Sequence, residues 1–240
     1  MALVRIPTES GAILYDPSRI DHPADVDFEP AALDAAGRIR GAAGGRGSAW
    51  YIEARGGAAY WVLRHFRRGG FVARLLTDWY AWSGAESTRS FRELRLLGEI
   101  EAFGLPAVRG IAARYVRSGL GYRADLLTVG LPGAQTLATL LPTTPALALW
   151  ERIGATLRAF HDAGIFHADL NAHNVLIVDG RDVFLVDFDR GERRAPGAWR
   201  EANLARLKRS IEKLSDRAAP AREWAALLAG YAVPRSLPPR

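Results

Sequence analysis

The sequence predicts an α+β fold with two lobes, an N-terminal antiparallel β-sheet lobe and a compact, mainly helical C-terminal lobe. Two observations predict this fold: paired strand-like segments before residue 130, and segments of helical period after residue 145. The 240 residues, of which 49% are apolar, suit one domain over residues 1–240, with lobes of about 1–130 and 131–240.

The N-terminal lobe follows a stretch that has no clear hydrophobic period. Residues 1–43 mix Pro, Asp and Ala, and we expect only short elements there, before the main fold. From Ala42 onward, strand-like runs on both sides of Gly57, bounded by glycine pairs, indicate a strand, a turn and a second strand. Periodicity and alternation then predict two helices and two further strands, at Phe71–Trp82, Ser90–Phe103, Ile111–Val116 and Tyr122–Val129.

The C-terminal lobe is predicted from helical periods on both sides of one hairpin. Apolar residues at spacings of three and four predict a helix over Pro145–Ala163. Asp179 and Gly180 form a strong two-residue turn signal between the strands Val175–Val178 and Val183–Val186. Two more helices are expected, at Leu204–Leu214 and Ala221–Tyr231.

Charge and composition exclude several kinds of site. The net charge is +6, and among the 32 Lys and Arg residues only Lys208 and Lys213 are lysines. Because the chain has no Cys, disulfides and Cys-ligated metal sites are excluded, and a metal would need Asp, Asn, Glu or His ligands. The segment Met1–Gly11 lacks a signal-peptide core and no apolar run reaches bilayer length, so we expect neither export nor a membrane-spanning segment.

The polar cluster carries the chemistry of phosphoryl transfer. Asp169 and Asn174 lie on a loop after a predicted helix, and Asp187 follows the second strand of the hairpin. Transfer from a nucleotide needs one carboxylate that accepts the proton of the attacking hydroxyl, and oxygen ligands for the magnesium that bridges the phosphates. We therefore expect Asp169 to be the catalytic group and Asn174 and Asp187 to bind the metal, while His167 is interpreted as structural.

This segment resembles the protein-kinase-like superfamily. Its catalytic-loop pattern, His-x-Asp-Leu-x-x-x-x-Asn, is matched by His167, Asp169, Leu170 and Asn174. The metal-binding Asp-Phe-Gly motif is matched at Asp187 and Phe188, but Asp189 replaces the glycine.

Longer segments between about residues 44 and 214 resemble the bacterial 3-deoxy-D-manno-octulosonic acid (Kdo) kinase family, at residues 63–70, 88–94, 122–126, 167–174 and 187–191. The resemblance implies a protein-kinase-like fold that phosphorylates, with ATP and magnesium, the 4-hydroxyl of Kdo on the lipid A precursor Kdo-lipid IVA. It also implies a peripheral protein on the cytoplasmic side of the cell inner membrane, acting in lipopolysaccharide biosynthesis.

The resemblance further implies a nucleotide clamp in the N-terminal lobe. Gly45 and Gly47 resemble the start of a glycine-rich loop over the phosphates, with Trp50 where a third glycine would stand. A plain start of a hairpin is the alternative reading of the two glycines.

The usual lysine of the clamp is absent, because both lysines lie beyond Asp187. Arg64 stands at its place, with Glu93 as its partner on the following helix, and a guanidinium would still supply a permanent cation. Arg64 could instead be a solvated strand residue, and Ser90-x-x-Glu93 also fits a capping box at a helix start.

Three features bear on partners. The chain ends at Arg240, 51 residues after Asp189, which is too short for the segment and helical platform that hold a peptide, so no protein substrate is expected. The basic segment 206–209 lacks an aromatic stacking platform, so no nucleic acid is expected either. The arginine clusters at 64, 67, 68 and at 190, 193, 194 are either solvated faces or contacts to acceptor phosphates and an anionic membrane surface.

Two other functions stay open at this point. A kinase of the same fold could act on another small molecule or another lipopolysaccharide sugar. A non-catalytic basic pseudokinase adaptor is the second alternative, because Trp50, Arg64 and Asp189 depart from the kinase pattern.

Overall fold

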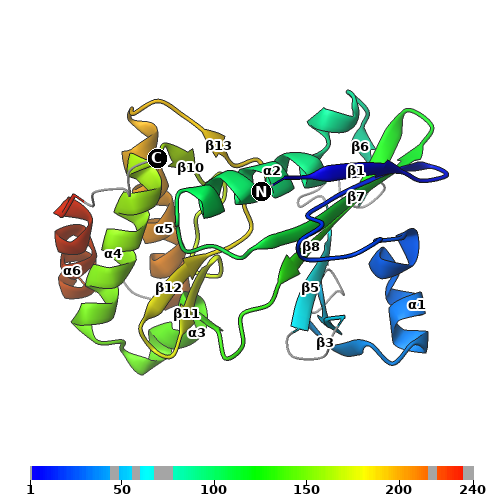
Figure 1. The fold of residues 1–240 in the computed structure, drawn as a ribbon. Coiled ribbons are helices and arrows are strands. Elements are labelled where there is room, and N and C mark those ends of the chain that lie inside the picture. Colours follow the sequence, from blue (N-terminus) through cyan, green and yellow to red (C-terminus); the bar gives the residue numbers. More distant parts are fainter. Residues whose placement is uncertain (1, 44–48, 56–59, 68–77, 216–220, 235–240) are drawn as a thin grey trace. The chain divides into compact units, whose positions relative to one another are not determined.

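The computed structural model describes residues 2–43, 49–55, 60–67, 78–215 and 221–234, and the contacts within the chain divide it into two compact units. Unit 1 contains Met1–Gly98 and Arg109–Gly130, and unit 2 contains Glu99–Val108 and Leu131–Arg240. Figure 1 labels most of the helices and strands of both units.

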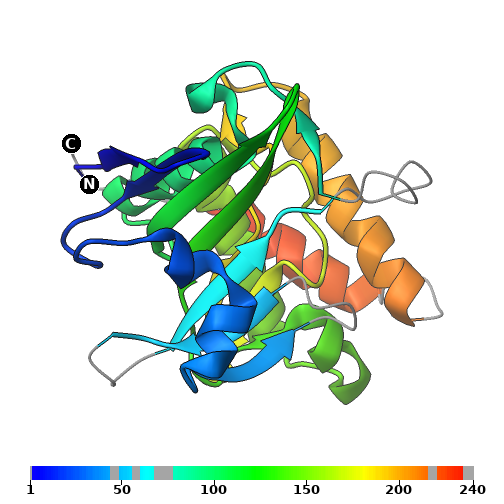
Figure 2. The same ribbon diagram turned by 90° about the vertical axis from the view of Figure 1, so that its right-hand side faces the viewer.

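Unit 1 is built on an antiparallel sheet, as its strand-like segments predict. Among the described residues the strand order is β1 (Val4–Pro7), β2 (Gly11–Tyr15), β7 (Gly110–Ser118), β8 (Gly121–Val129), β5 (Tyr60–His65), β4 (Ala49–Glu53) and β3 (Ile39–Ala43), with β6 (Tyr80–Ala81) paired to β8. The long strands β7 and β8 lie side by side, as Figure 2 shows. They confirm the two strands predicted between residues 111 and 129.

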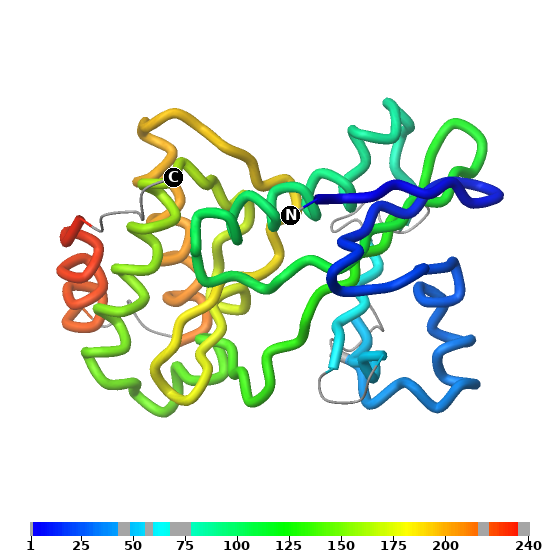
Figure 3. The backbone as a smooth tube through the Cα atoms, viewed as in Figure 1, coloured from blue at the N-terminus to red at the C-terminus, as the bar shows by residue number. Residues whose placement is uncertain are grey.

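The first 43 residues belong to this sheet, so the prediction that they precede the main fold is wrong. Strand β2 pairs with β7 from Gly11 opposite Val116 to Tyr15 opposite Ala112, and Figure 3 shows the N-terminal segment running beside β7. Strands of four and five residues are too short to show a period, and they are defined by pairing with a distant strand.

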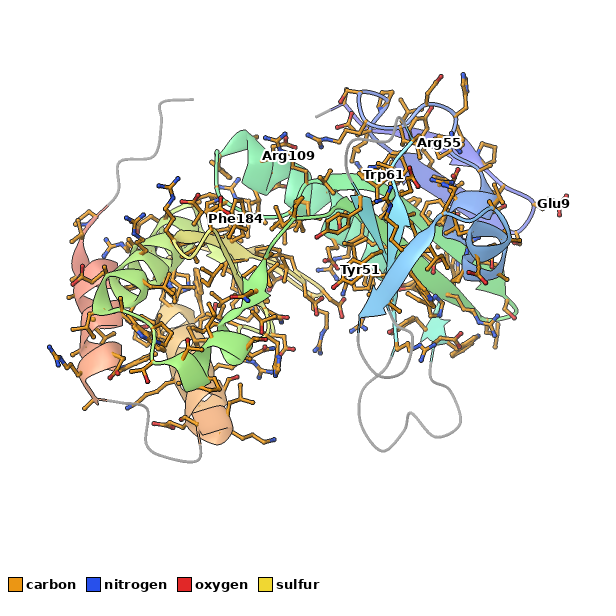
Figure 4. The ribbon with its side chains drawn as sticks, turned by 90° about the horizontal axis from the view of Figure 1, so that it is seen from below. Glu9, Tyr51, Arg55, Trp61, Arg109 and Phe184 are labelled. Carbon is orange, nitrogen blue, oxygen red and sulfur yellow. The ribbon has the colours of Figure 1, made fainter. Side chains whose placement is uncertain are left out.

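One face of the sheet is covered by the N-terminal segment. The short helices η1 (Asp25–Phe28) and α1 (Pro30–Ala35) bring Phe28 and Leu33 into a core that includes Trp61 of β5. Arg55, labelled with Trp61 in Figure 4, donates to both carboxylate oxygens of buried Asp27 at 2.7 and 2.8 Å. This core consists of Ile13, Tyr15, Ile20, Phe28, Leu33, Ile52, Ala54, Trp61, Leu63, Ile111, Ala112 and Leu127.

The other face of the sheet carries α2 (Arg89–Ala102), which confirms the helix predicted over residues 90–103. Side chains alternate along β5, and Trp61 and Leu63 lie in the core on the α1 side. Val62 and Arg64 therefore project on the face that carries α2. The rings of Phe91 in α2 and Tyr115 in β7 lie 5.2 Å apart, measured between centroids. A short 3-10 turn, η3 (Ala85–Ser87), precedes the helix.

The segment between β5 and α2 departs from the prediction of a helix over Phe71–Trp82. Residues 71–77 lie outside the described residues, but the predicted end is wrong because Tyr80 and Ala81 form strand β6. Tyr80 is opposite Tyr122 of β8, and their rings lie 5.6 Å apart. Pairing with the sheet outweighs local helical preference here.

The turn predicted at Gly57 also lies outside the described residues.

Unit 2 contains the three helices predicted for it, although α5 begins earlier than expected. They are α4 (Leu147–Asp162), α5 (Trp199–Ser215) and α6 (Ala221–Ala232). Helices α4 and α6 pack side by side (Figure 1). Gly154 and Gly230 permit this contact, because a Cβ on either glycine would lie 1.9 Å from a backbone oxygen of the other helix.

The predicted hairpin of unit 2 is present, with a connection one residue longer than its turn signal indicates. Strands β11 (Val175–Val178) and β12 (Asp182–Leu185) are antiparallel, and Val178 pairs with Asp182. Asp179 and Gly180 have φ of 49° and 68°, as a type I′ turn requires. Arg181 N–H closes the turn on Val178 O at 3.1 Å.

Several short elements of unit 2 carry no hydrophobic period and were not predicted. Strand β10 (Ile165–Phe166) precedes residues 167–174, which we call the polar loop. It pairs with β13 (Glu192–Arg193), which follows that loop in the sequence. The others are β9 (Gln135–Thr136), which pairs with β11, the helix α3 (Leu137–Leu140) and the 3-10 turn η4 (Leu141–Thr143).

A buried histidine connects α4 to the end of α6. His161 is 1% exposed, and its Nδ1 lies 2.8 Å from the Tyr231 hydroxyl. Burial lowers the pKa of His161 to about 4. In the unfolded chain the pKa is about 6.5, so acid protonates the unfolded state first and stability falls as pH drops from about 6.5 toward 4.

Lowering the pH from 7 to 4 should therefore reduce the free energy of unfolding by about 3 kcal/mol through His161 alone. Urea denaturation at several pH values measures this slope. His161→Asn should have a shallower slope than the unchanged protein, whereas His173→Asn, at an exposed position, should keep it. Equal slopes for the two variants would contradict this role of His161.

Candidate active site

The polar loop of unit 2 is anchored by a buried histidine. His167 is 2% exposed, and its Nε2 donates to Val186 O at 2.9 Å. Its Nδ1 accepts from the Asp169 N–H at 3.2 Å. Burial lowers the pKa of His167, so the neutral ring that these two hydrogen bonds need is favoured. Both ring nitrogens are engaged, which supports the structural interpretation of this residue.

Val186 connects the polar loop to Asp187, the next residue in the sequence. While its carbonyl accepts from His167, its N–H donates to Asn174 O at 3.1 Å. The next residue, Asp187, has a φ of 62°, a left-handed conformation that Asp tolerates better than most residues. The hydrogen bonds therefore hold Asp187 beside Asn174, and strained backbone of this kind is concentrated at functional sites.

The carboxylate of Asp169 is held from two sides and is 42% exposed. Asn171 Nδ2 donates to Asp169 Oδ2 at 3.2 Å and to its backbone oxygen at 3.0 Å. Arg206 forms an ion pair with Oδ1. An ionised carboxylate with a fixed orientation and solvent access can accept a proton from a hydroxyl group.

Asn174 and Asp187 offer the oxygen ligands that a hard cation prefers. Asn174 Nδ2 donates to Asp169 O at 2.9 Å, which orients the amide and leaves Oδ1 as its acceptor atom. The carboxylate of Asp187 supplies the charge. No group of three or more His, Asp or Glu side chains in the described parts of the chain could hold a metal ion. The donor set fits magnesium that is shared with nucleotide phosphates.

Phe188 packs beneath the loop. It is fully buried, its ring stacks on Phe160 at 5.7 Å, and it lies 4.7 Å from the ring of His167. The following residue, Asp189, replaces a glycine without backbone strain, because the positive φ angles fall at Asp187 and Arg190.

Helix α5 contacts the loop along one face, which sequence reasoning missed. Asn203 Nδ2 donates to His167 O at 2.8 Å, Arg206 pairs with Asp169, and Ser210 Oγ accepts from Ala172 N–H at 3.1 Å. Spacings of three and four place the three side chains on one face of the helix. That spacing was readable in the sequence, but nothing local indicated which loop the face contacts.

In unit 1, Arg64 and Glu93 form an ion pair between β5 and α2. Glu93 is 3% exposed and Arg64 is 24% exposed. The guanidinium also lies over the ring of Phe66, 4.4 Å from its centroid. The alternative capping box does not form, because the helix begins at Arg89 and Ser90 Oγ donates to Arg114 O at 2.9 Å.

The predicted site residues thus fall into two groups. Asp169, Asn174 and Asp187 are brought together in unit 2, and Arg64 and Glu93 in unit 1. Gly45 and Gly47 lie outside the described residues. Trp50, the expected third position of the glycine-rich loop, packs against the core beneath α1.

Replacing Glu93 should destabilise unit 1, because it leaves a cation without its buried partner. We expect Glu93→Ala to lower the free energy of unfolding by about 3 kcal/mol. Urea denaturation checks this value. The matched control is Glu86→Ala, which removes an exposed carboxylate 2.7 Å from Arg95 and should cost less than about 1 kcal/mol. Equal losses in both variants would contradict a structural role for the Arg64–Glu93 pair.

A family model described as the lipopolysaccharide kinase (Kdo/WaaP) family matches residues 31–231. The chain is also similar to proteins named 3-deoxy-D-manno-octulosonic acid kinase. One from Stenotrophomonas maltophilia (strain R551-3) is 47% identical over 206 residues, which cover 85% of this chain and 81% of that protein. Proteins from Xanthomonas campestris pv. campestris (strain B100) and Xylella fastidiosa (strain 9a5c) are 46% identical, with the same coverage.

Among solved structures, the chain is similar to WaaP in complex with acyl carrier protein. The TM-score is 0.53 at 17% sequence identity, and the match covers 84% of this chain and 80% of that one. A likeness at this identity concerns the fold alone. It confirms the protein-kinase-like α+β fold that the sequence predicts.

Proposed function

Because the chain belongs to the lipopolysaccharide kinase (Kdo/WaaP) family, we propose that it transfers the γ-phosphoryl group of ATP to the 4-hydroxyl of Kdo on Kdo-lipid IVA. Relatives named Kdo kinase at 46% to 47% identity support the choice of sugar. The grouping of Asp169, Asn174 and Asp187 by the hydrogen bonds of Val186 is the observation that carries the reaction type. The reaction belongs to lipopolysaccharide core biosynthesis.

In this proposal Asp169 accepts the proton of the attacking sugar hydroxyl. Asn171 and Arg206 orient its carboxylate, and its partial exposure leaves room for an acceptor. Since phosphoryl transfer involves little covalent chemistry by the protein, correct placement of the hydroxyl is the main contribution of this residue.

Asn174 Oδ1 and the Asp187 carboxylate would hold magnesium in the same proposal. The chemistry supplied by the bound ion is neutralisation of the charge on the phosphate oxygens. Arg64, held by Glu93, would contact the α- and β-phosphates in place of the usual lysine, and Gly45 and Gly47 are the other residues proposed to bind the nucleotide.

A transfer assay tests the function. The full-length chain, incubated with labelled ATP, magnesium and Kdo-lipid IVA, should place label on Kdo at O4, as located by NMR of the product. Omitting magnesium should abolish transfer. Asp169→Ala should lower turnover about 10³-fold without unfolding the protein, because the hydroxyl loses its proton acceptor.

The control for that variant is Asp182→Ala, which removes an exposed carboxylate from β12 and should keep normal turnover. Near-normal turnover of Asp169→Ala would contradict its catalytic role. Label on a different sugar or small molecule would favour a kinase with another acceptor, and no ATP turnover with any acceptor would favour the non-catalytic adaptor.

A peripheral position on the anionic cytoplasmic face of the inner membrane is also proposed. The net charge of +6 and the exposed cluster of Arg190, Arg193 and Arg194 support it. Arg193 and Arg194 lie over the rings of Phe103 and Phe166, at 5.1 and 3.5 Å, which fixes their position on unit 2. In the described residues, no helix has both the length and the apolar character needed to cross a bilayer.

Sedimentation with vesicles tests this position. Binding to vesicles that contain anionic lipid should exceed binding to neutral vesicles and should weaken as salt is added. Neutralising Arg190, Arg193 and Arg194 to Gln should reduce binding by about 10-fold or more. The control removes the same charge elsewhere on unit 2, at exposed Arg152, Arg181 and Arg222. Equal binding of both triple variants would contradict a role for the cluster.

A further inference from the structure

Arg206 orients the carboxylate of Asp169 in the proposed transfer, but that role does not by itself explain why the guanidinium is half-exposed beside this group. It lies on α5, within unit 2, and its guanidinium contacts the carboxylate of Asp169. Within the described parts of the chain, this is the only side-chain hydrogen bond or ion pair of Arg206. Its side chain is 48% exposed and only Nη2 bonds the carboxylate, so a guanidinium with five N–H donors keeps capacity for a further partner beside the candidate catalytic group.

The neighbours of Arg206 on the same helix face already hold the loop in place. Asn203 bonds the backbone oxygen of His167, and Ser210 bonds the backbone N–H of Ala172. These two contacts are made to the backbone, on both sides of Asp169. Arg206 instead contacts the functional side chain, and a half-exposed ion pair contributes little to stability. Its position therefore suits recognition of a ligand better than support of the loop.

The acceptor in the proposed function is an acidic sugar, which carries a carboxylate in addition to its hydroxyl groups. A guanidinium binds a carboxylate through two parallel hydrogen bonds, which fixes orientation as well as position. We propose that Arg206 is the specificity-determining residue that binds the carboxylate of the sugar acid while a hydroxyl of the same sugar approaches Asp169. The inference rests on the proposed function and adds the group by which the acceptor is recognised.

Two charges close together make this arrangement selective. A neutral sugar of the same shape would leave Arg206 on Asp169, where it competes with the incoming hydroxyl for the carboxylate oxygen. An acidic sugar offers the guanidinium a second anion, so the hydroxyl and the carboxylate of one acceptor can engage Asp169 and Arg206 together. Rejection of neutral sugars would follow from the same contact that favours acidic ones.

The test compares two acceptors that differ only in this charge: Kdo-lipid IVA and its analogue with a carboxamide in place of the Kdo carboxylate. For the unchanged full-length chain, kcat/KM should be roughly 10- to 100-fold lower with the carboxamide, mainly through KM. Arg206→Met should lower kcat/KM for the acid and bring the two acceptors within about 3-fold of each other. Arg206→Lys should restore part of the preference, since it keeps the charge without the fork.

The matched control is Arg209→Met, at an exposed position of the same helix, which should keep the full preference for the acid. Thermal unfolding of each variant verifies that it is folded. An undiminished preference in Arg206→Met would overturn the inference, as would equal rates of the unchanged chain with both acceptors. If the unchanged chain phosphorylates neither acceptor, the proposed function itself fails, and that result is distinct from equal rates on both.

Discussion

Val186 connects the two sequence segments of the candidate site, since its carbonyl accepts from His167 and its N–H donates to Asn174. The candidate site residues of unit 2 are next to these bonds: Asp187 follows Val186, and Asp169 donates its N–H to the other nitrogen of His167. His167 is buried against the ring of Phe188, and a hydrogen bond made by a buried group is electrostatically stronger than one in water. Loss of either bond would separate the oxygen atoms that the proposed mechanism needs together.

Helix α5 adds a rigid support to this loop. Its contacts are made at one-turn intervals, to the backbone at two points and to the carboxylate of Asp169 at a third. The loop that carries the candidate site residues is thereby fixed by a helix, and support from a rigid element is how a short segment keeps a defined geometry. Helix α5 also brings Arg206 to Asp169, so the helix that supports the loop places a positive charge beside the candidate catalytic carboxylate.

No lysine precedes Asp187 in the sequence, and the cation proposed in place of the usual lysine lies in unit 1. Arg64, which we propose as the substitute for that lysine, lies on β5 and is paired with buried Glu93, so its guanidinium is directed toward α2 by a partner on that helix. Phe28 and Leu33 of the N-terminal segment close one face of the sheet, and Arg64 projects from the opposite face, which carries α2. The first 43 residues therefore contribute to the arrangement of β5 even though they contain none of the predicted site residues.

The sequence by itself determined the α+β class, the strands β7 and β8, the helices α2, α4, α5 and α6, and the segments that would carry Asp169, Asn174 and Asp187. These features depend on period, turn chemistry and spacing along the chain, which are local. Only the tertiary structure decided that residues 1–43 join the sheet, that Tyr80 lies in a strand, and that Arg206 reaches Asp169. Each of these depends on a partner far away in the sequence, whose energy of pairing or packing outweighs local preference, so no local pattern could predict it.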